Sequence, residues 1–346
     1  MSLFRMRLVA VVAVVALVAA ACGGGDGAGS DAVSDGARTI TVYSGRNKAL
    51  VGDLLERFTK DTGIKLAVRY ADSASLAAQL LEEGGRSPAD VFFSQDAGAI
   101  GALSKKGLLG PAPAAARDAV EPRYRSTDGT WVGVSGRARV IVYNSKNVPE
   151  AEVPASVFEL TDPKWKGRLA VAPSNASFQS FVTAMRIQAG EARTADWLRG
   201  LKANEPKTYP SNIPVVEAVD TGQADLGLVN HYYLYERIAA VGADKVVARN
   251  AFTRNGDPGA LINVAAVGIL KSSRKQAGAA AFVTYLLSPA AQRFFAQRTH
   301  EYPLLAGVPL AEGLTPLADI ESPDIDLSDL DTLEQTLAMI REAGLL

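Results

Sequence analysis

Strand-like and helix-like segments alternate through the first part of this chain, and this alternation constrains its fold more than any other feature. Short apolar runs with the two-residue period of a strand are separated by segments with helical spacing. The expected strands span residues 39–43, 64–70 and 90–93, and the expected helices span 48–62, 73–83 and about 97–106. Gly63, Gly84 and Gly107 follow the three helices, at the position where glycine commonly ends a helix. This order predicts a parallel sheet covered by helices on both faces.

Two long extended runs predict how the chain passes between two such units. Residues 131–143 form one run, interrupted by Gly136, and residues 260–270 form the other. Between them lies a second set of expected strands, 168–172 and 226–229, and expected helices, 178–188 and 215–221. We therefore expect an α/β fold of two lobes joined by two crossing strands, a hinged clamshell that closes around a ligand. The expected lobes are residues 38–138 with 263–312, and residues 139–262 with 313–346.

The first residues have the build of a bacterial export signal. Arg5 and Arg7 precede an apolar stretch, residues 8–21, which is shorter than the about 20 residues that a membrane-spanning helix needs. Small residues then precede Cys22, the only cysteine, as at a bacterial lipoprotein processing site. We expect a signal peptide at 1–21 and a lipidated flexible tether at 22–37. The alternative is an ordinary signal peptide that leaves a free thiol, and a single cysteine excludes an intrachain disulfide.

From this leader we expect the mature protein to lie at the extracytoplasmic face of the membrane, in the periplasm or cell-wall space, held by lipid alone. Its charge argues against a nucleic-acid partner, which would require a clustered basic face. The chain has 36 Lys and Arg against 37 Asp and Glu, and loss of Arg5 and Arg7 with the signal leaves 34 − 37 = −3.

Residue usage also argues against catalysis. Only two histidines are present, and Ser135 lies in Gly133-Val134-Ser135-Gly136, which lacks the spacing of a nucleophile elbow. The sequence contains no Walker loop, no zinc-protease motif and no cysteine cluster. We therefore expect a binding protein, with a secreted hydrolase as the enzymatic alternative.

Tyr232 and Tyr233 are the candidate ligand-binding residues. They follow the apolar run 226–229 and open an expected helix at 232–240, at the end of a strand, where open α/β sheets place their ligand crevices. A phenol loses its proton near pH ~10 in water, and the phenolate is a hard anionic donor suited to Fe³⁺. The alternative for any Tyr-Tyr pair is that both rings pack in the core.

From residue 39 to about 305 the chain resembles the ferric-ion-binding proteins that deliver iron to bacterial ATP-driven importers. The matching stretches are Ile40-Thr41-Val42-Tyr43-Ser44-Gly45, Ser87-Pro88-Ala89-Asp90-Val91-Phe92, Val134-Ser135-Gly136-Arg137-Ala138-Arg139-Val140, Pro163-Lys164-Trp165-Lys166-Gly167-Arg168, Asn230-His231-Tyr232-Tyr233, Asp257-Pro258-Gly259-Ala260-Leu261 and Glu301-Tyr302-Pro303-Leu304. The resemblance implies a class II periplasmic-binding fold, Fe³⁺ held between the lobes by Tyr232 and Tyr233, and a monomer that works with a membrane permease and its ATPase.

A second part of the expected site is an anion-binding loop. Ser174, Asn175, Ala176 and Ser177 lie between a strand and a helix, where free backbone N–H groups at a helix start can bind an anion. In the resembled family this loop holds a phosphate or carbonate that completes the iron shell, and the assisting amides correspond to Asn212 and Asn230. Arg46, Arg137 and Arg139 are possible anion partners, although such arginines more often form surface ion pairs.

Two departures from the family pattern weaken the expected metal shell. Asn47 stands where many members have a histidine, and Gln95 stands where they have a carboxylate. Some members bring a third tyrosine from the anion loop, a role that Phe178 cannot fill. Asp96 could approach the metal instead, but an acid at that position is more often a helix N-cap. His231 adjoins the pair, yet a residue next to a ligand usually points elsewhere, and His300 is expected to be structural.

These departures make the anion important and leave a second interpretation open. Fe³⁺ with two tyrosinates carries +1, and a bound dianion brings the sum to −1, which a closed cleft tolerates. The alternative is a metal-free clamshell that binds a phosphonate, another oxyanion or a polyamine, with the tyrosines lining its cleft. Visible colour separates the two, because ferric tyrosinate absorbs visible light.

Overall fold

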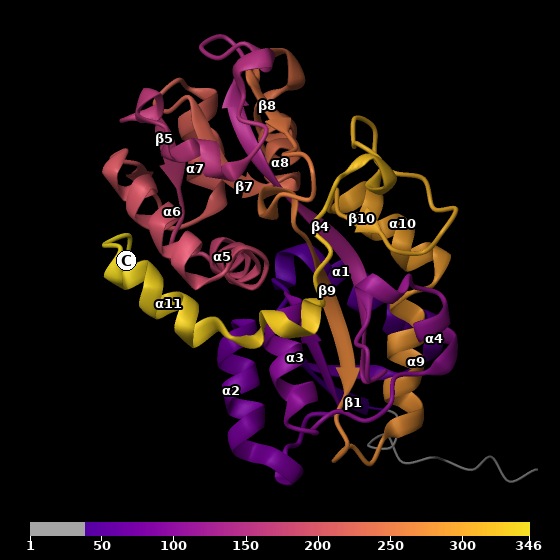
Figure 1. Ribbon diagram of the computed structural model, residues 1–346. Helices are drawn as coiled ribbons and strands as arrows, with labels where there is room; N and C mark the ends of the chain where they lie inside the picture. Colours follow the sequence, from indigo (N-terminus) through magenta and orange to yellow (C-terminus); the bar gives the residue numbers. More distant parts are fainter. Residues whose placement is uncertain (1–38) are drawn as a thin grey trace, which may run out of the picture. The chain divides into compact units, whose positions relative to one another are not determined.

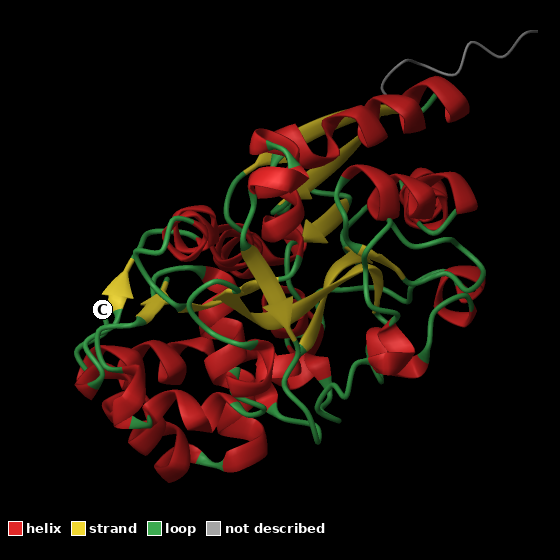
Figure 2. Ribbon diagram, turned by 90° about the horizontal axis from the view of Figure 1, so that it is seen from above, coloured by secondary structure: helices red, strands yellow, loops and turns green. Residues whose placement is uncertain are grey.

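The structure of the protein is a computed structural model, which describes residues 39–346. The expected signal peptide (1–21), the tether (22–37), the lipidation site Cys22 and residue 38 lie outside the described residues. Within the described part, no helix combines the length and apolarity required to cross a membrane. The described residues belong to one compact unit, in which helices flank a central set of strands (Figure 2).

The predicted alternation at the start of the chain is confirmed. β1 (Thr39–Ser44), β2 (Lys65–Tyr70) and β3 (Val91–Ser94) alternate with α1 (Lys48–Thr62), α2 (Ser73–Glu83) and α3 (Ala97–Lys105). β1 lies between β2 and β3 and is parallel to both. α1 buries Val51, Leu54, Leu55 and Phe58, one face of the helix at the expected spacing. It ends at Gly63, whose left-handed φ of 70° allows its amide to reach the carbonyl of Thr59.

Two antiparallel strands carry the chain between two sheets, as the extended runs predict. β4 (Trp131–Asn144) pairs with β9 (Ile262–Ile269) along residues 131–138. From Arg139 onward β4 pairs with β7 (Leu226–Asn230), and from Ile141 also with β8 (Ala248–Ala251). One sheet therefore has the order β2-β1-β3-β9-β4 and the other continues as β4-β7-β5-β6. Figure 1 shows β4 and β9 running between the two groups of helices.

The remaining strands and helices complete the two sheets. β5 (Leu169–Val171) is parallel to β7 and to β6 (Lys207–Thr208), and β10 (Tyr302–Pro303) is antiparallel to β4. The other helices are α4 (Ala114–Asp118), α5 (Ala176–Ala189), α6 (Glu191–Ala203), α7 (Asn212–Asp220), α8 (Tyr232–Val241), α9 (Gln276–Leu286), α10 (Pro289–Arg298) and α11 (Leu333–Glu342). The predicted α/β fold of two lobes joined by two crossing strands is confirmed.

The interruption in β4 differs from the sequence-based expectation. The register shift lies between Gly133 and Ser135 rather than at Gly136. A Cβ on Gly133 would come within 2.6 Å of the carbonyl oxygen of Tyr124, so the backbone of a neighbouring segment passes too close for a side chain. This close approach, which no local pattern reveals, accounts for a glycine beside the bulge.

Separate apolar cores support the two sheets. One core contains buried residues of β1, β3, α1, α2, α3, β9, α9 and α10, together with Leu314, Ile320, Leu327 and Leu330 from the C-terminal region. Two further cores pack against the second sheet, and one of them includes Ile340 and Leu345 at the end of the chain. The expected lobe boundaries at 138/139, 262/263 and 312/313 stay a prediction.

Candidate functional site

A cavity of about 90 Å³ lies where β4 changes from one sheet to the other. Its walls come from the ends of β3 and β7, the middle of β4, the first turns of α5 and α8, and the start of β9 with the residue before it. The lining residues are Gln95, Asp96, Arg137, Arg139, Asn175, Ala176, Ser177, Asn230, Tyr232, Tyr233, Leu261 and Asn263. Most of them carry polar groups, so the cavity suits a charged ligand.

Tyr232 and Tyr233 both line this cavity from the first turn of α8. Their ring centroids are 4.3 Å apart and the rings are tilted by 32°. Tyr232 is buried and Tyr233 is half-buried. Burial, and then the neighbouring Tyr233, raises the pKa of Tyr232 well above its ordinary value, while Arg137 acts in the opposite direction. Ionisation of this phenol therefore requires a compensating cation.

His231 faces away from the cavity and is fixed by two hydrogen bonds. The amide of Ala138 donates to its Nδ1 at 3.1 Å, and its Nε2 lies 2.8 Å from the carbonyl of His300. Because Nδ1 accepts, the proton resides on Nε2 and the ring is neutral. Burial lowers the pKa of His231 to about 4. Both ring nitrogens are occupied, as expected for a residue that adjoins a ligand-binding pair.

Arg139 presents a buried positive charge to the cavity. Its guanidinium donates to Ser177 Oγ at 3.1 Å and to the carbonyl of Leu228 at 2.8 Å, and it lies 5.5 Å from the ring centroid of Phe181. None of the ion pairs within residues 39–346 includes Arg139. Burial lowers its pKa to about 9, so the group stays cationic at neutral pH.

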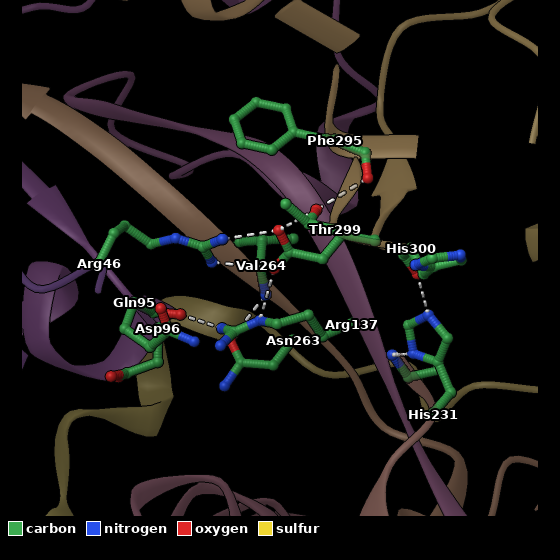
Figure 3. Close-up of polar contacts among 12 residues, drawn as sticks. Arg46, Gln95, Asp96, Arg137, His231, Asn263, Val264, Phe295, Thr299 and His300 are labelled. Atoms are coloured by element: carbon green, nitrogen blue, oxygen red, sulfur yellow. Dashed lines mark hydrogen bonds and ion pairs between the residues drawn. The ribbon is translucent and has the colours of Figure 1, made fainter. Parts of the chain in front are cut away.

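Arg137 and Arg46 meet at one buried carboxylate behind the cavity. Arg137 donates to the backbone carbonyl of Gln95, and its Nε lies 3.9 Å from Glu301 Oε1. Arg46 binds both oxygens of Glu301, at 2.9 and 2.6 Å. Burial acts to raise the pKa of Glu301, but the pairing with Arg46 outweighs it and holds that pKa below its usual range. Figure 3 shows these contacts together with the bond between His231 and His300.

The anion-loop residues are organised around the start of α5. Asn175 caps this helix, and its Oδ1 accepts from the backbone N–H of Ser177 at 3.0 Å and from the side chain of Asn212 at 3.1 Å. Asn175, Ala176 and Ser177 line the cavity, as does Asn230. Asn212 is buried behind the loop and holds it in place. Ser174 is not among the lining residues.

The two neutral amides take different positions. The Asn47 side chain caps α1 by accepting from the amide of Ala49 at 2.9 Å and is exposed, so it does not line the cavity. Gln95 does line it. Asp96 caps α3, as expected, through the amide of Ala99 at 3.0 Å, and it also lines the cavity; its approach to a metal stays a prediction. Arg46, a possible anion partner, pairs with Glu301 and does not line the cavity.

Three residues at or behind the cavity were not expected from the sequence to lie there. Leu261 and Asn263 line it, and Glu301 neutralises Arg46 from a sequence distance of 255 residues. Asn263 is the single polar residue in the apolar run 260–270, a signal that could have identified it. Its Oδ1 accepts from the amide of Ala97 at 3.2 Å and so connects β9 to the start of α3.

Known proteins share both the sequence and the structure. Residues 86–326 match the bacterial extracellular solute-binding proteins. The chain is 35% identical over 308 residues to the Fe(3+)-binding periplasmic protein of Serratia marcescens. The matched region covers 89% of this chain and 90% of that protein. Iron-bound HitA from Pseudomonas aeruginosa has a TM-score of 0.83 and 33% identity, covering 88% of this chain and 99% of its own. Trichodesmium IdiA (FutA), in complex with iron and citrate, has a TM-score of 0.78 and 29% identity, with 88% and 99% covered.

Proposed function

This chain belongs to the family of bacterial extracellular solute-binding proteins, and from that membership we propose that it captures Fe³⁺ for import. The metal binds at Tyr232 and Tyr233 together with a synergistic anion, carbonate or phosphate. The loaded protein then delivers iron to an ABC permease driven by its ATPase. Its relatives are named as binding proteins, and we propose no enzymatic step.

The observation that carries this proposal is the pair of adjacent phenols in one polar cavity. Each phenolate is a hard oxygen donor, and hard donors prefer small, highly charged cations such as Fe³⁺. Burial raises the pKa of Tyr232 and Arg137 only partly opposes this effect, so a bound cation has to supply the stabilisation of the phenolate. Gln95 and Asp96 lie in the same cavity and are available to complete the shell, whereas Asn47 is turned outward.

The buried arginines support the anion. Arg139 has no carboxylate partner in the described ion pairs, and an unpaired buried cation is unfavourable unless a counter-charge binds. The same guanidinium is 3.1 Å from Ser177 Oγ at the N-terminus of α5, so charge and helix dipole favour an anion at one place. Carbonate and phosphate are small enough for a cavity of about 90 Å³.

We further propose how the protein is held and how it moves. Cys22 carries lipid that anchors the monomer to the extracytoplasmic face of the membrane, and residues 22–37 give it reach. The lobes are residues 38–138 with 263–312, and residues 139–262 with 313–346, and they close on the metal by bending at β4 and β9.

The surplus of arginine also favours one rival function, a metal-free cleft that binds an oxyanion. In that case the phenols would donate hydrogen bonds to the anion and would never ionise. The tyrosines would then not coordinate iron, and the protein would stay colourless.

Titration of the purified protein with Fe³⁺ in the presence of phosphate or bicarbonate decides between the two. The proposal predicts a visible charge-transfer band that saturates at one iron per protein. No band, together with tight binding of the anion alone, would contradict iron capture and support the oxyanion binder.

A further inference from the structure

Glu301 is the one carboxylate among the buried charges around the cavity. Arg46, Arg137, Arg139 and Glu301 are 1%, 4%, 2% and 0% exposed. Three guanidinium groups against one carboxylate give 3 − 1 = +2, and the partly exposed Asp96 at the rim adds −1. The size of this buried sum depends on Glu301 and on the Arg46 that it binds.

Neither member of this pair lines the cavity, so neither touches a ligand there. Glu301 instead acts through its neighbours. It binds Arg46 with both oxygens, accepts from Thr299 Oγ1 at 2.9 Å, and lies 3.9 Å from Nε of Arg137. Arg46 and Thr299 therefore converge on the same carboxylate, and Figure 3 labels both residues. The electrostatic influence of Glu301 extends to Tyr232, and that of Arg46 to both tyrosines.

We propose that the Arg46–Glu301 pair sets the balance between anion affinity and iron affinity in the cavity, without contact to either ligand. This inference rests on the proposed function, because it concerns the same site. Binding a dianion adds two negative charges. Binding Fe³⁺ with release of two phenol protons adds 3 − 2 = +1. A change of one buried charge near the cavity therefore shifts the two affinities in opposite directions.

Four proteins form a charge cycle around the pair. Wild type has a buried sum of +2, Glu301→Gln has +3, Arg46→Met has +1, and the double variant returns to +2. Gln retains the shape of Glu and a carbonyl acceptor, while Met fills most of the volume of the Arg stem. Urea unfolding of each protein confirms that it is folded before ligands are added.

Two titrations are performed on every member of the cycle. Calorimetry measures the affinity of the iron-free protein for inorganic phosphate. A competing chelator measures Fe³⁺ affinity at saturating phosphate. Glu301→Gln should bind phosphate about tenfold more tightly and Fe³⁺ several-fold more weakly, as expected for one charge within roughly 10 Å. Arg46→Met should show both changes with the opposite sign, and the double variant should return close to wild type for both ligands.

A purely structural role for the pair predicts a different pattern. Loss of the ion pair would then weaken both ligands in each single variant, and the double variant would not recover. That pattern, or unchanged affinities throughout, would overturn the proposal. If Glu301→Gln fails to fold, Arg46→Met provides the same test. In that variant Glu301 still has a positively charged neighbour, Arg137. The phosphate titration needs no iron, so it tests the effect of the pair on anion affinity even if iron capture itself proves wrong.

Discussion

The amide of Ala138 donates a hydrogen bond to Nδ1 of His231 at 3.1 Å. Ala138 is the last residue of β4 that pairs with β9, and the next residue, Arg139, already pairs with β7. His231 precedes Tyr232, and their rings meet edge to face with centroids 5.7 Å apart. The point at which the chain crosses between sheets is therefore bonded to the residue that precedes the tyrosine pair.

His231 should make the stability of the iron-free protein depend on pH. Burial lowers its pKa in the fold to about 4, against about 6.5 in an unfolded chain. The neutral form is favoured by folding, so the stabilisation is fully present above pH ~6.5 and is lost as pH falls toward 4. The expected loss is about 3 kcal/mol. The His231→Gln variant has no titrating group at this position. It should be less stable than wild type at neutral pH and should lack this pH-dependent loss of stability.

Urea unfolding at a series of pH values measures this dependence. His300→Asn is the matched control, because it removes the other imidazole, and asparagine tolerates the positive φ of 53° at that position. Between pH ~6.5 and 4 the control should lose most of the unfolding free energy that wild type loses. Equal pH profiles for wild type and His231→Gln would show that His231 is not the titrating group.

Arg139 should carry the dependence on the anion. Arg139→Gln removes the cation that has no carboxylate partner in the described ion pairs, so phosphate affinity of the iron-free protein should fall by at least about tenfold. Arg139→Lys retains the charge but loses the planar fork and should be intermediate. Calorimetric titration with phosphate measures both. The assignment of Arg139 to the anion fails if Arg139→Gln binds phosphate as wild type does.

Iron affinity should fall steeply with acidification. Burial, and then Tyr233, raises the pKa of Tyr232 well above its ordinary value, so the iron-free protein holds this phenol protonated at neutral pH. Binding through both phenolates releases two protons, and apparent affinity should fall about 100-fold for each pH unit below ~10. Competition with a chelator of known pH dependence measures the slope. A slope near zero is incompatible with a shell of two tyrosinates.

Attachment to the membrane should depend on one residue. Cys22→Ser removes the thiol that a lipid would modify, and each buried CH₂ of an acyl chain contributes about 0.8 kcal/mol to membrane binding. Fractionation of cells should move the protein from the membrane pellet to the soluble fraction. A variant that still sediments with membranes would refute the lipoprotein interpretation.

Local patterns predicted the elements whose stabilising contacts are local. α1 and α2 span the expected residues 48–62 and 73–83, because spacing, an N-cap and a following glycine define a helix from its own sequence. β4 was expected as an extended run at 131–143, and it spans Trp131–Asn144. α5 begins at Ala176, two residues before the expected 178, because the side chain of Asn175 caps it.

The charge arrangement at the site could not be predicted in the same way. Tyr232 and Tyr233 were recognised from their place after a strand, and the anion loop from its place before a helix. Arg46 gave no sign that its partner would be Glu301, because the pair spans 255 residues and depends on β10 lying against β4. The position of the Asn47 side chain likewise could not be predicted, because the sequence allows its amide either to cap α1 or to face the cavity.

The most direct test of iron capture at the tyrosine pair is Fe³⁺ titration of Tyr232→Phe and Tyr233→Phe, each followed by visible absorption and chelator competition. Each substitution removes one oxygen donor and keeps the ring. Tyr235→Phe is the matched control, because its hydroxyl lies on the same helix but donates to the carbonyl of Gly313, and Asn47→Ala is a second. Both cavity variants should lose or shift the visible band and bind iron far more weakly, while both controls stay close to wild type. Equal effects in all four variants would contradict the assignment of Fe³⁺ to Tyr232 and Tyr233.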